Sequence, residues 1–478
     1  MRLRLAAILL ISALALVGAA GASRPESGGG DDGGSGSTQA PSNGGAVFVL
    51  TGSGYGHGVG LNQYGARAQA LAGRTAGDIL GFYYPGTTIG TAAGRTVRVL
   101  LVPSAVSLTV LASTPFTVRD ATGAAYALPA GEVTVGPDLQ VPVDGVATPL
   151  DGPLTFSAPA GSLLSLGGKA YRGKLELSST GTALQATDVV GLEAYVQGVV
   201  PGEMPSTWPE AALEAQAIAA RSYALASVVG GAAWDVYPDG RSQQYLGASA
   251  ETPQTTAAVT ATARQVVLYG GEVATTFYSS SSGGRTASAF DTFGLNLAYL
   301  PTEADPWDDT SPYHVWTPTS YTGQQLARKL GLKAPVVDVT SQLSDSDRVA
   351  SLVAVAADGS SLELSGSEVS TRLALRSTAF HLGTLRFLTQ ASPASAGTKV
   401  LLAGVARDVD APTLERLDQS GLWEPVVKSF AVRPDGSFAV VVRPKQTTTY
   451  RLSASGLSGP ALTIPVVGAS GATGQGTS

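Results

Sequence analysis

The chain has 478 residues, a net formal charge of −6 and no cysteine. Its length predicts roughly two to three domains, and a hydrophobic content of 44% is enough to form packed cores. The lack of cysteine excludes disulfides, a thiol nucleophile and a lipid-modified cysteine. No basic patch stands out, which argues against nucleic acid as a partner.

The N-terminal residues are typical of an export signal. The start, MRLR, carries two arginines, and the apolar run that follows ends in small residues at Ala20-Gly21-Ala22. This order predicts a secretory signal peptide over 1–22 that is cleaved. Because the apolar run is about 18 residues long, an uncleaved membrane anchor is the alternative. The Gly/Ser-rich residues 23–45 are expected to form a flexible linker.

The folded part is predicted to begin near Ala46, with a strand that leads into a glycine-rich stretch around His57. Alternate glycines suit an extended chain that a ligand or another backbone approaches closely, and they leave the His57 ring unshielded. His57 is therefore either a site residue or a structural histidine. Helices are expected over 62–71, with Gly73 as the C-cap, and over 75–83.

Residues from about 95 to 190 form short runs rich in β-branched residues, which predict strands. Helical spacing of apolar residues follows from Leu192 to Val199. An alanine-rich helix is expected next, because Thr207 and Glu210 have the spacing of a capping box.

Glu203 lies between these two predicted helices, in the segment VVPGEMP. Charged residues make up only 14% of the chain, so a carboxylate in so apolar and rigid a segment is unusual. It is either the acid of an active site or a cap for the helix that begins at Pro209.

The C-terminal half is mostly strands and loops. Residues 243–247 and the region up to 290 indicate turns and strands, and the clustered acids from Glu303 to Asp309 are expected to be solvated. Alternating residues predict an immunoglobulin- or fibronectin-like sandwich over 391–468, followed by a disordered tail over 469–478. The fold class is α+β: a β-rich domain over 46–390, divided into 46–92, 93–190 and 191–390, precedes the sandwich.

Several stretches resemble the stage II sporulation protein D (SpoIID/LytB) family. One family signature is similar to LEAYVQGVVPGEMPSTWPEAALEAQAIAARSYAL, which starts at Leu192, and the other to GYGHGVGLNQYGARAQALAGRTAGDILGFYYPGT, which starts at Gly54. The shorter stretches YRGKLEL, FYSSSSGG, YLPTEADPW and LALRSTAF also fit the family. The resemblance covers about residues 46–390.

The resemblance implies peptidoglycan as substrate. Family members studied as enzymes are lytic transglycosylases, which cleave between N-acetylmuramic acid and N-acetylglucosamine without water and leave a 1,6-anhydro end. Others are described as enhancers of cell-wall amidases, so a non-catalytic wall-binding enhancer is the alternative, and a purely structural scaffold is a third. The family's catalytic glutamate corresponds to Glu203, and its implicated arginine corresponds to Arg221.

One carboxylate can serve this reaction. Hydrolytic glycosidases usually use two, whereas here one acid would protonate the leaving oxygen and then accept the proton of the muramic 6-hydroxyl. Such an acid needs a raised pKa, which the apolar neighbours Met204, Pro205 and Trp208 would supply. The substrate is expected to contact a further set of side chains, namely His57, Gln63, Tyr64, Trp208, Gln216, Tyr223 and Ser282.

The sequence departs from the better-known members in two ways. Its glycine-rich motif precedes the Glu203 segment instead of following it, as in a circular permutation. The cysteine and histidine that hold zinc in some members are missing near residues 235–247. No metal and no cofactor are therefore expected. The expected partners are peptidoglycan glycan strands and a cell-wall amidase, and the expected location is outside the cell, at the wall or anchored to the membrane.

Overall fold

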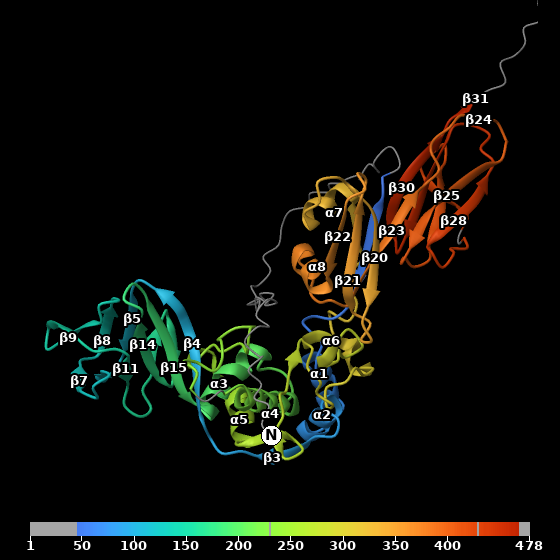
Figure 1. Ribbon diagram of the computed structural model, residues 1–478. Coiled ribbons are helices and arrows are strands. Elements are labelled where there is room, and N and C mark those ends of the chain that lie inside the picture. The colour runs from blue at the N-terminus through green and yellow to red at the C-terminus, as the bar shows by residue number, and fades with distance from the viewer. Residues whose placement is uncertain (1–44, 229–230, 428–429, 468–478) are drawn as a thin grey trace, which may run out of the picture. The chain divides into compact units, whose positions relative to one another are not determined.

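The computed structural model describes residues 45–228, 231–427 and 430–467 (Figure 1). The predicted signal peptide, the linker up to residue 44 and the predicted C-terminal tail lie outside the described residues. The described chain is rich in strands with a few helices, which confirms the α+β class. It divides into two compact units, Tyr55–Ser311 and a second unit made of residues 45–54 and 312–467. No described helix is both long and apolar enough to cross a membrane.

The first unit begins with the glycine-rich motif and two short helices. β2 (Leu61–Asn62) leads into α1 (Gln63–Leu71), and α2 (Ala76–Tyr83) follows. Both predicted helices are confirmed to within a residue. A capping box of Thr75 and Asp78 starts α2. Gly73, with φ of 84°, directly follows the C-cap Ala72 of α1, so it takes the left-handed position that glycine favours.

The strands predicted from 95 to 190 are confirmed. β4 (Thr96–Ala105) and β15 (Leu184–Gly191) pair within a six-stranded sheet of order β4-β15-β14-β11-β6-β7, and a four-stranded sheet has order β13-β12-β5-β8. The remaining strands of this region are β3 (Thr88–Thr91), β5 (Leu108–Ala112), β6 (Phe116–Arg119), β7 (Ala125–Leu128), β8 (Gly131–Val135), β9 (Gln140–Val143), β10 (Val146–Pro149), β11 (Leu154–Ser157), β12 (Leu164–Leu166), β13 (Lys169–Tyr171) and β14 (Lys174–Ser179).

The helices around Glu203 form the centre of the first unit. α3 (Leu192–Glu203) continues through Pro201, so Glu203 is its last residue and not part of a separate link. α4 (Glu210–Ser227) packs against both α3 and α5 (Pro253–Ala261). The buried face of α4 is largely alanine, which lets these neighbours approach its backbone. The other elements here are η2 (Ala248–Ala250), β16 (Gln265–Tyr269), β17 (Glu272–Val273), β18 (Tyr278–Ser279), α6 (Ala289–Phe293) and η3 (Pro306–Thr310).

The predicted capping box at Thr207 is wrong. The N-cap of α4 is Pro209, and no side chain within the described residues caps this helix end. Thr207 lies instead in a turn closed by the hydrogen bond that the Trp208 N–H donates to the Pro205 carbonyl at 3.0 Å. The turn holds Thr207 outside the helix, so its spacing to Glu210 has no capping role.

The second unit is built around a five-stranded sheet of order β19-β1-β23-β25-β28 (Figure 1). Its strands are β1 (Val47–Gly52), β19 (Thr319–Thr322), β23 (Phe380–Phe387), β25 (Val400–Arg407) and β28 (Ser437–Val442). The unit also contains α7 (Gly323–Leu330), α8 (Gly366–Leu373), β20 (Val336–Leu343), β21 (Val349–Ala356), β22 (Ser361–Ser365), β24 (Ala394–Ser395) and β31 (Val466–Val467).

The C-terminal strands form two facing sheets, as expected for a sandwich. β25 and β28 belong to one sheet, and β26 (Thr413–Leu417), β27 (Trp423–Val427), β29 (Thr448–Ala454) and β30 (Leu457–Ile464) form the other. One apolar cluster joins them, and it also contains Val49 of β1 and Leu385 of β23. The sandwich therefore shares both a sheet and a core with strands that come before it in sequence.

Candidate functional site

Two glycines of α3 let a neighbouring segment reach Glu203. A Cβ added to Gly202 would lie 2.6 Å from the Gln244 carbonyl oxygen, and one added to Gly198 would lie 2.6 Å from the Tyr245 ring. Any side chain at these positions would push the 243–247 segment away. Because it lies so close, the Gln244 N–H donates to Glu203 Oε1 at 2.7 Å.

The second carboxylate oxygen of Glu203 faces the glycine-rich motif. Gln63, the first residue of α1, donates through Nε2 to Glu203 Oε2 at 3.2 Å. The same nitrogen lies 3.3 Å from Oε1 of Gln216, which is fully buried on α4. The two signature stretches of the sequence thus meet at Glu203, although the motif order is reversed.

The surroundings of Glu203 favour its protonated form. Burial raises the pKa of Glu203, while hydrogen bonds from the Gln244 backbone, Gln63 and Tyr278 lower it in part. The net effect is a pKa above the usual value for glutamate, as expected for a general acid. Of the three apolar neighbours expected to cause this, Met204 is buried, Trp208 is half-buried and Pro205 is exposed.

Two side chains next to Glu203 were missed by the sequence analysis. Gln243 donates through Nε2 to the Tyr278 hydroxyl at 2.8 Å and accepts from the Tyr195 hydroxyl at 2.9 Å. Burial raises the pKa of Tyr278 well above its usual value, so this hydroxyl stays neutral and can donate. The sequence predicts turns and strands for residues 243–290, and no periodicity marks Gln243 or Tyr278 as a site residue.

Tyr64 and Trp208 form an aromatic pair beside Glu203. Their ring centroids are 5.0 Å apart in an edge-to-face arrangement, and both side chains are half-buried. Tyr64 follows Gln63 on α1, and Trp208 lies in the turn that follows Glu203. Half-exposed aromatic rings of this kind suit the apolar face of a sugar.

Tyr223 of α4 also lies near Glu203. Burial raises the pKa of Tyr223, and the charge of Glu203 contributes a smaller effect in the same direction. Its ring packs against Phe277 with centroids 5.9 Å apart. The structure thus brings Gln63, Gln216 and Tyr223 together around the carboxyl group.

His57 is held within its own loop. Its Nδ1 accepts a hydrogen bond from the Val59 N–H at 3.0 Å, and its ring meets Phe293 edge-on at 5.2 Å. The glycines around it allow a close approach of β18, since a Cβ on Gly56 would lie 2.9 Å from the Cβ of Ser279. The His57 ring therefore lies against the aromatic rings of Phe277 and Phe293.

Ser282 belongs to a buried polar cluster. Its hydroxyl donates to Asp305 Oδ2 at 2.9 Å, and Asn62 Nδ2 donates to Asp305 Oδ2 and to Asp308 Oδ1, each at 2.8 Å. The expectation that the acidic loop is solvated is wrong for these two aspartates, which are at most 1% exposed. Amide and hydroxyl donors compensate for their burial. Because Asn62 is the N-cap residue of α1, the cluster fixes the start of the helix that carries Gln63.

Arg221 is fully buried and forms an ion pair with Glu193 at the start of α3. Its Nε and Nη2 donate to the two Glu193 carboxylate oxygens at 3.0 and 2.8 Å. Nη1 also reaches the Gln265 carbonyl oxygen at 3.1 Å. The structure places this guanidinium where it ties α3 to α4 and β16.

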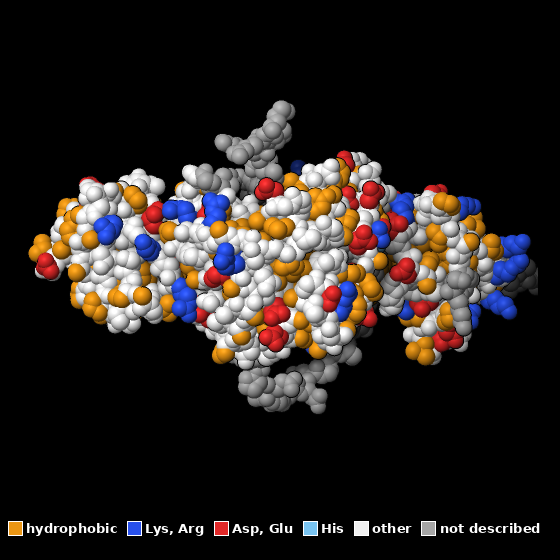
Figure 2. Space-filling view, turned by 90° about the horizontal axis from the view of Figure 1, so that it is seen from below, with side chains coloured by type: hydrophobic (Ala, Val, Ile, Leu, Met, Phe, Trp, Pro, Cys, Tyr) orange, Lys and Arg blue, Asp and Glu red, His pale blue; other side chains and the backbone are white. Residues whose placement is uncertain are grey.

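The described side chains offer no evident metal site. Within residues 45–228, 231–427 and 430–467, no three His, Asp or Glu side chains group in a way that could hold a metal ion. On the face displayed in Figure 2, Lys and Arg are interspersed with Asp and Glu.

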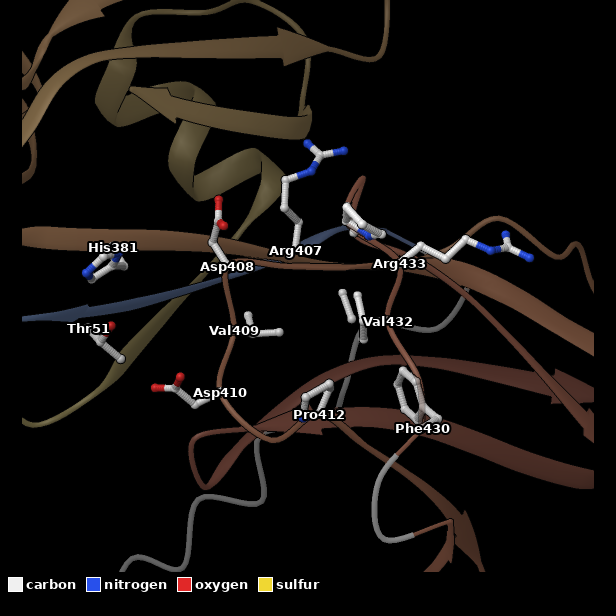
Figure 3. A pocket seen from close by; sticks show the side chains of 13 residues that line it. Thr51, His381, Arg407, Asp408, Val409, Asp410, Pro412, Phe430, Val432 and Arg433 are labelled. Carbon is white, nitrogen blue, oxygen red and sulfur yellow. The ribbon is translucent and has the colours of Figure 1, made fainter. Parts of the chain in front are cut away.

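A separate groove of about 520 Å³ lies in the second unit (Figure 3). It is lined by apolar groups such as Val409 and Phe430 and by charged groups of both signs, including Arg433 and Asp410. None of the predicted site residues lies in it. Its mixed lining does not indicate one class of ligand.

Comparison with known proteins gives a family and several relatives. Residues 180–269 match the model of the family described as SpoIID, Stage II sporulation protein. An uncharacterised protein of Brachyspira hyodysenteriae is 34% identical over 161 residues, which is 31% of this chain and 44% of the relative. The Stage II sporulation protein D of Bacillus subtilis is 28% identical over 216 residues, 42% of this chain and 62% of the relative.

An Amidase enhancer of Bacillus subtilis is 33% identical over 140 residues, which is 29% of this chain and 19% of the relative. The chain thus spans less than two thirds of the length of each of these relatives. No solved structure matches.

Proposed function

We propose that this chain, a member of the stage II sporulation protein D family, is a lytic transglycosylase that acts on the glycan strands of peptidoglycan. The observation that carries the proposal is the environment of the Glu203 carboxyl group, which favours its protonated form. Its pKa is raised by burial, and its hydrogen-bond partners, Gln63, Tyr278 and the Gln244 backbone, are all neutral. A carboxyl group so placed can hold a proton near neutral pH and release it to a bound substrate.

The proposed reaction uses this one carboxyl group twice. Glu203 first donates its proton to the oxygen that links N-acetylmuramic acid to the next sugar, and the bond from C1 to that oxygen breaks. The resulting carboxylate then accepts the proton of the muramic 6-hydroxyl as O6 attacks C1. The new C1–O6 bond closes the 1,6-anhydro ring, and Glu203 ends protonated, as it began.

The neighbouring residues have proposed roles that follow from their positions. Tyr64 and Trp208 stack on sugar rings, and Tyr223 lies at the carboxyl group. The fully buried Gln216 accepts a hydrogen bond from Gln63 through Oε1, so we assign it to holding Gln63 beside Glu203. His57 and Ser282 shape the glycine-rich loop, and the bound glycan strand lies against this loop.

Arg221 has a proposed positioning role. Its contacts with Glu193 and with backbone carbonyls hold α3 against α4, and Glu203 ends α3. We therefore assign it to the placement of Glu203 and not to contact with the sugar.

The second candidate is a non-catalytic enhancer of a cell-wall amidase. It is favoured by the 33% identity to a protein named Amidase enhancer, a match that covers only 19% of that protein. In both cases the site of action is the wall outside the cell, with glycan strands as the ligand and an amidase as a further partner. Sporulation and vegetative wall remodelling are equally compatible with this site.

Digestion of purified glycan strands in ¹⁸O-labelled water tests the proposal. A lytic transglycosylase gives 1,6-anhydro ends that carry no label, because O6 and not water attacks C1. New reducing ends that carry label would show a hydrolase instead. Bound strands without new ends, together with a faster reaction of an added amidase, would show the enhancer.

A further inference from the structure

Arg67 lies on the same face of α1 as Gln63. The two are four residues apart, which is about 6 Å along a helix, and Gln63 touches Glu203. The Arg67 guanidinium lies 5.9 Å from the centre of the Trp208 ring, and that ring packs against Tyr64. Arg67 thus borders the aromatic pair beside the proposed acid.

The charge of Arg67 is not neutralised within the described residues. Its guanidinium forms no ion pair and no hydrogen bond there, and it lies against the Trp208 ring. Other arginines of the same unit have polar partners: Arg221 pairs with Glu193, and Arg74, just after α1, donates to Gln69 Oε1 at 2.9 Å. A half-buried guanidinium fixed against an indole keeps its planar set of donors available.

We propose that Arg67 is a specificity-determining residue that binds a carboxylate carried by the glycan strand. The inference rests on the proposed glycan substrate and adds the recognition of charge to it. Guanidinium groups bind carboxylates through paired, charge-assisted hydrogen bonds. In peptidoglycan a carboxylate comes either from the lactyl group of N-acetylmuramic acid or from the peptide attached to it.

The test measures binding and needs no turnover. In the Glu203→Gln background, dissociation constants are measured for three soluble ligands: peptide-free strands, peptide-bearing strands and the neutral hexamer of N-acetylglucosamine. Arg67→Met removes the charge and keeps much of the side-chain volume. Arg74→Met is the matched control, since Arg74 also lies over a tryptophan, 5.7 Å from the centre of the Trp307 ring.

Arg67→Met should weaken binding of the carboxylate-bearing strands by about tenfold to a hundredfold. It should change the dissociation constant of the neutral hexamer by less than about twofold. Arg74→Met should leave the dissociation constants of all three ligands unchanged. If Arg67→Met loses affinity for peptide-free strands, Arg67 binds the lactyl carboxylate. If it loses affinity for peptide-bearing strands alone, Arg67 binds a carboxylate of the peptide. The salt dependence of binding should also become weaker.

An equal loss for charged and neutral ligands would overturn the inference, because it would show that Arg67 only packs on Trp208. No loss for any ligand would overturn it as well. If the Glu203→Gln protein binds none of the three, the glycan substrate itself fails, and the inference fails with it. If binding depends on Arg67 but the wild-type protein makes no anhydro ends, only the lytic activity fails.

Discussion

The side-chain amide of Gln63 donates to the carboxylate of Glu203 at 3.2 Å, although 140 residues separate the two in sequence. This contact joins the glycine-rich motif to the end of α3. It also supplies one of the hydrogen bonds that favour the ionised form of Glu203 and so moderate the effect of burial on its pKa.

Replacing Gln63 with leucine should therefore raise the pKa of Glu203 further. The hydrogen bond lowers that pKa, and its loss leaves burial less opposed. The limb of the pH–rate profile that reports Glu203 should move to higher pH. Gln254→Leu, on the exposed surface of α5, serves as the control and should leave the profile in place. A shift to lower pH in Gln63→Leu would contradict this assignment.

The ion pair of Glu193 with the fully buried Arg221 should be costly to break from the glutamate side. Glu193→Ala leaves a buried guanidinium without its counter-ion, which should lower the free energy of unfolding by about 3–5 kcal/mol. Urea denaturation measures this. The comparison is Glu176→Ala, which removes the partner of Arg98. The Arg98 side chain is 30% exposed and can be solvated, so this loss should cost about 1 kcal/mol or less. Equal costs for the two variants would argue against the structural role of Arg221.

Asp188 should make stability fall as pH rises. Burial raises the pKa of Asp188 to about 7 from its usual value of 3.8, so between these pH values the folded state holds a proton that the unfolded state has lost. Between about pH 4 and pH 7 ionisation therefore destabilises the fold, by up to about 4 kcal/mol from this group.

Asp188→Asn should remove most of this dependence. The difference in unfolding free energy between variant and wild type, measured by urea denaturation at several pH values, should grow in favour of the variant from about pH 4 to pH 7 and level off above pH 7. Parallel profiles for the two proteins would mean that Asp188 does not titrate in this range.

Asn62→Ala should loosen the start of α1. It removes the amide donor shared by the buried Asp305 and Asp308, which should cost about 1–3 kcal/mol of stability for each carboxylate left without that donor. Thermal unfolding should show a smaller loss at low pH, because burial raises the pKa of Asp305 and its protonated carboxyl group depends less on this donor. Asn296→Ala, at an exposed position, is the control. A loss of the same size at every pH would indicate a packing effect alone.

The sequence was most informative where the signal is local. The helix before Glu203, the helices at 62–71 and 75–83, and the strands from 95 to 190 follow from spacing and composition, and the structure contains them. The connection expected at Glu203 is instead the last turn of α3. The burial of Asp305 and Asp308 could not be predicted in this way, because their partner Asn62 lies 243 and 246 residues away in sequence. The role of Gln243 depends on contacts with Tyr278 and Tyr195, 35 and 48 residues away in sequence. The turn at Pro205 removed the predicted cap of α4.

The central claim is that Glu203 alone performs the acid and base steps on a glycan strand. Mass spectrometry of peptide-free and peptide-bearing strands, incubated with the wild-type protein, Glu203→Gln and Glu210→Gln, tests it most directly. Glu210 is an exposed residue in the first turn of α4 and controls for the loss of a nearby carboxylate. We expect 1,6-anhydro ends with the wild type and Glu210→Gln and none with Glu203→Gln. Anhydro ends from Glu203→Gln at the wild-type rate, or none from any of the three, would contradict it.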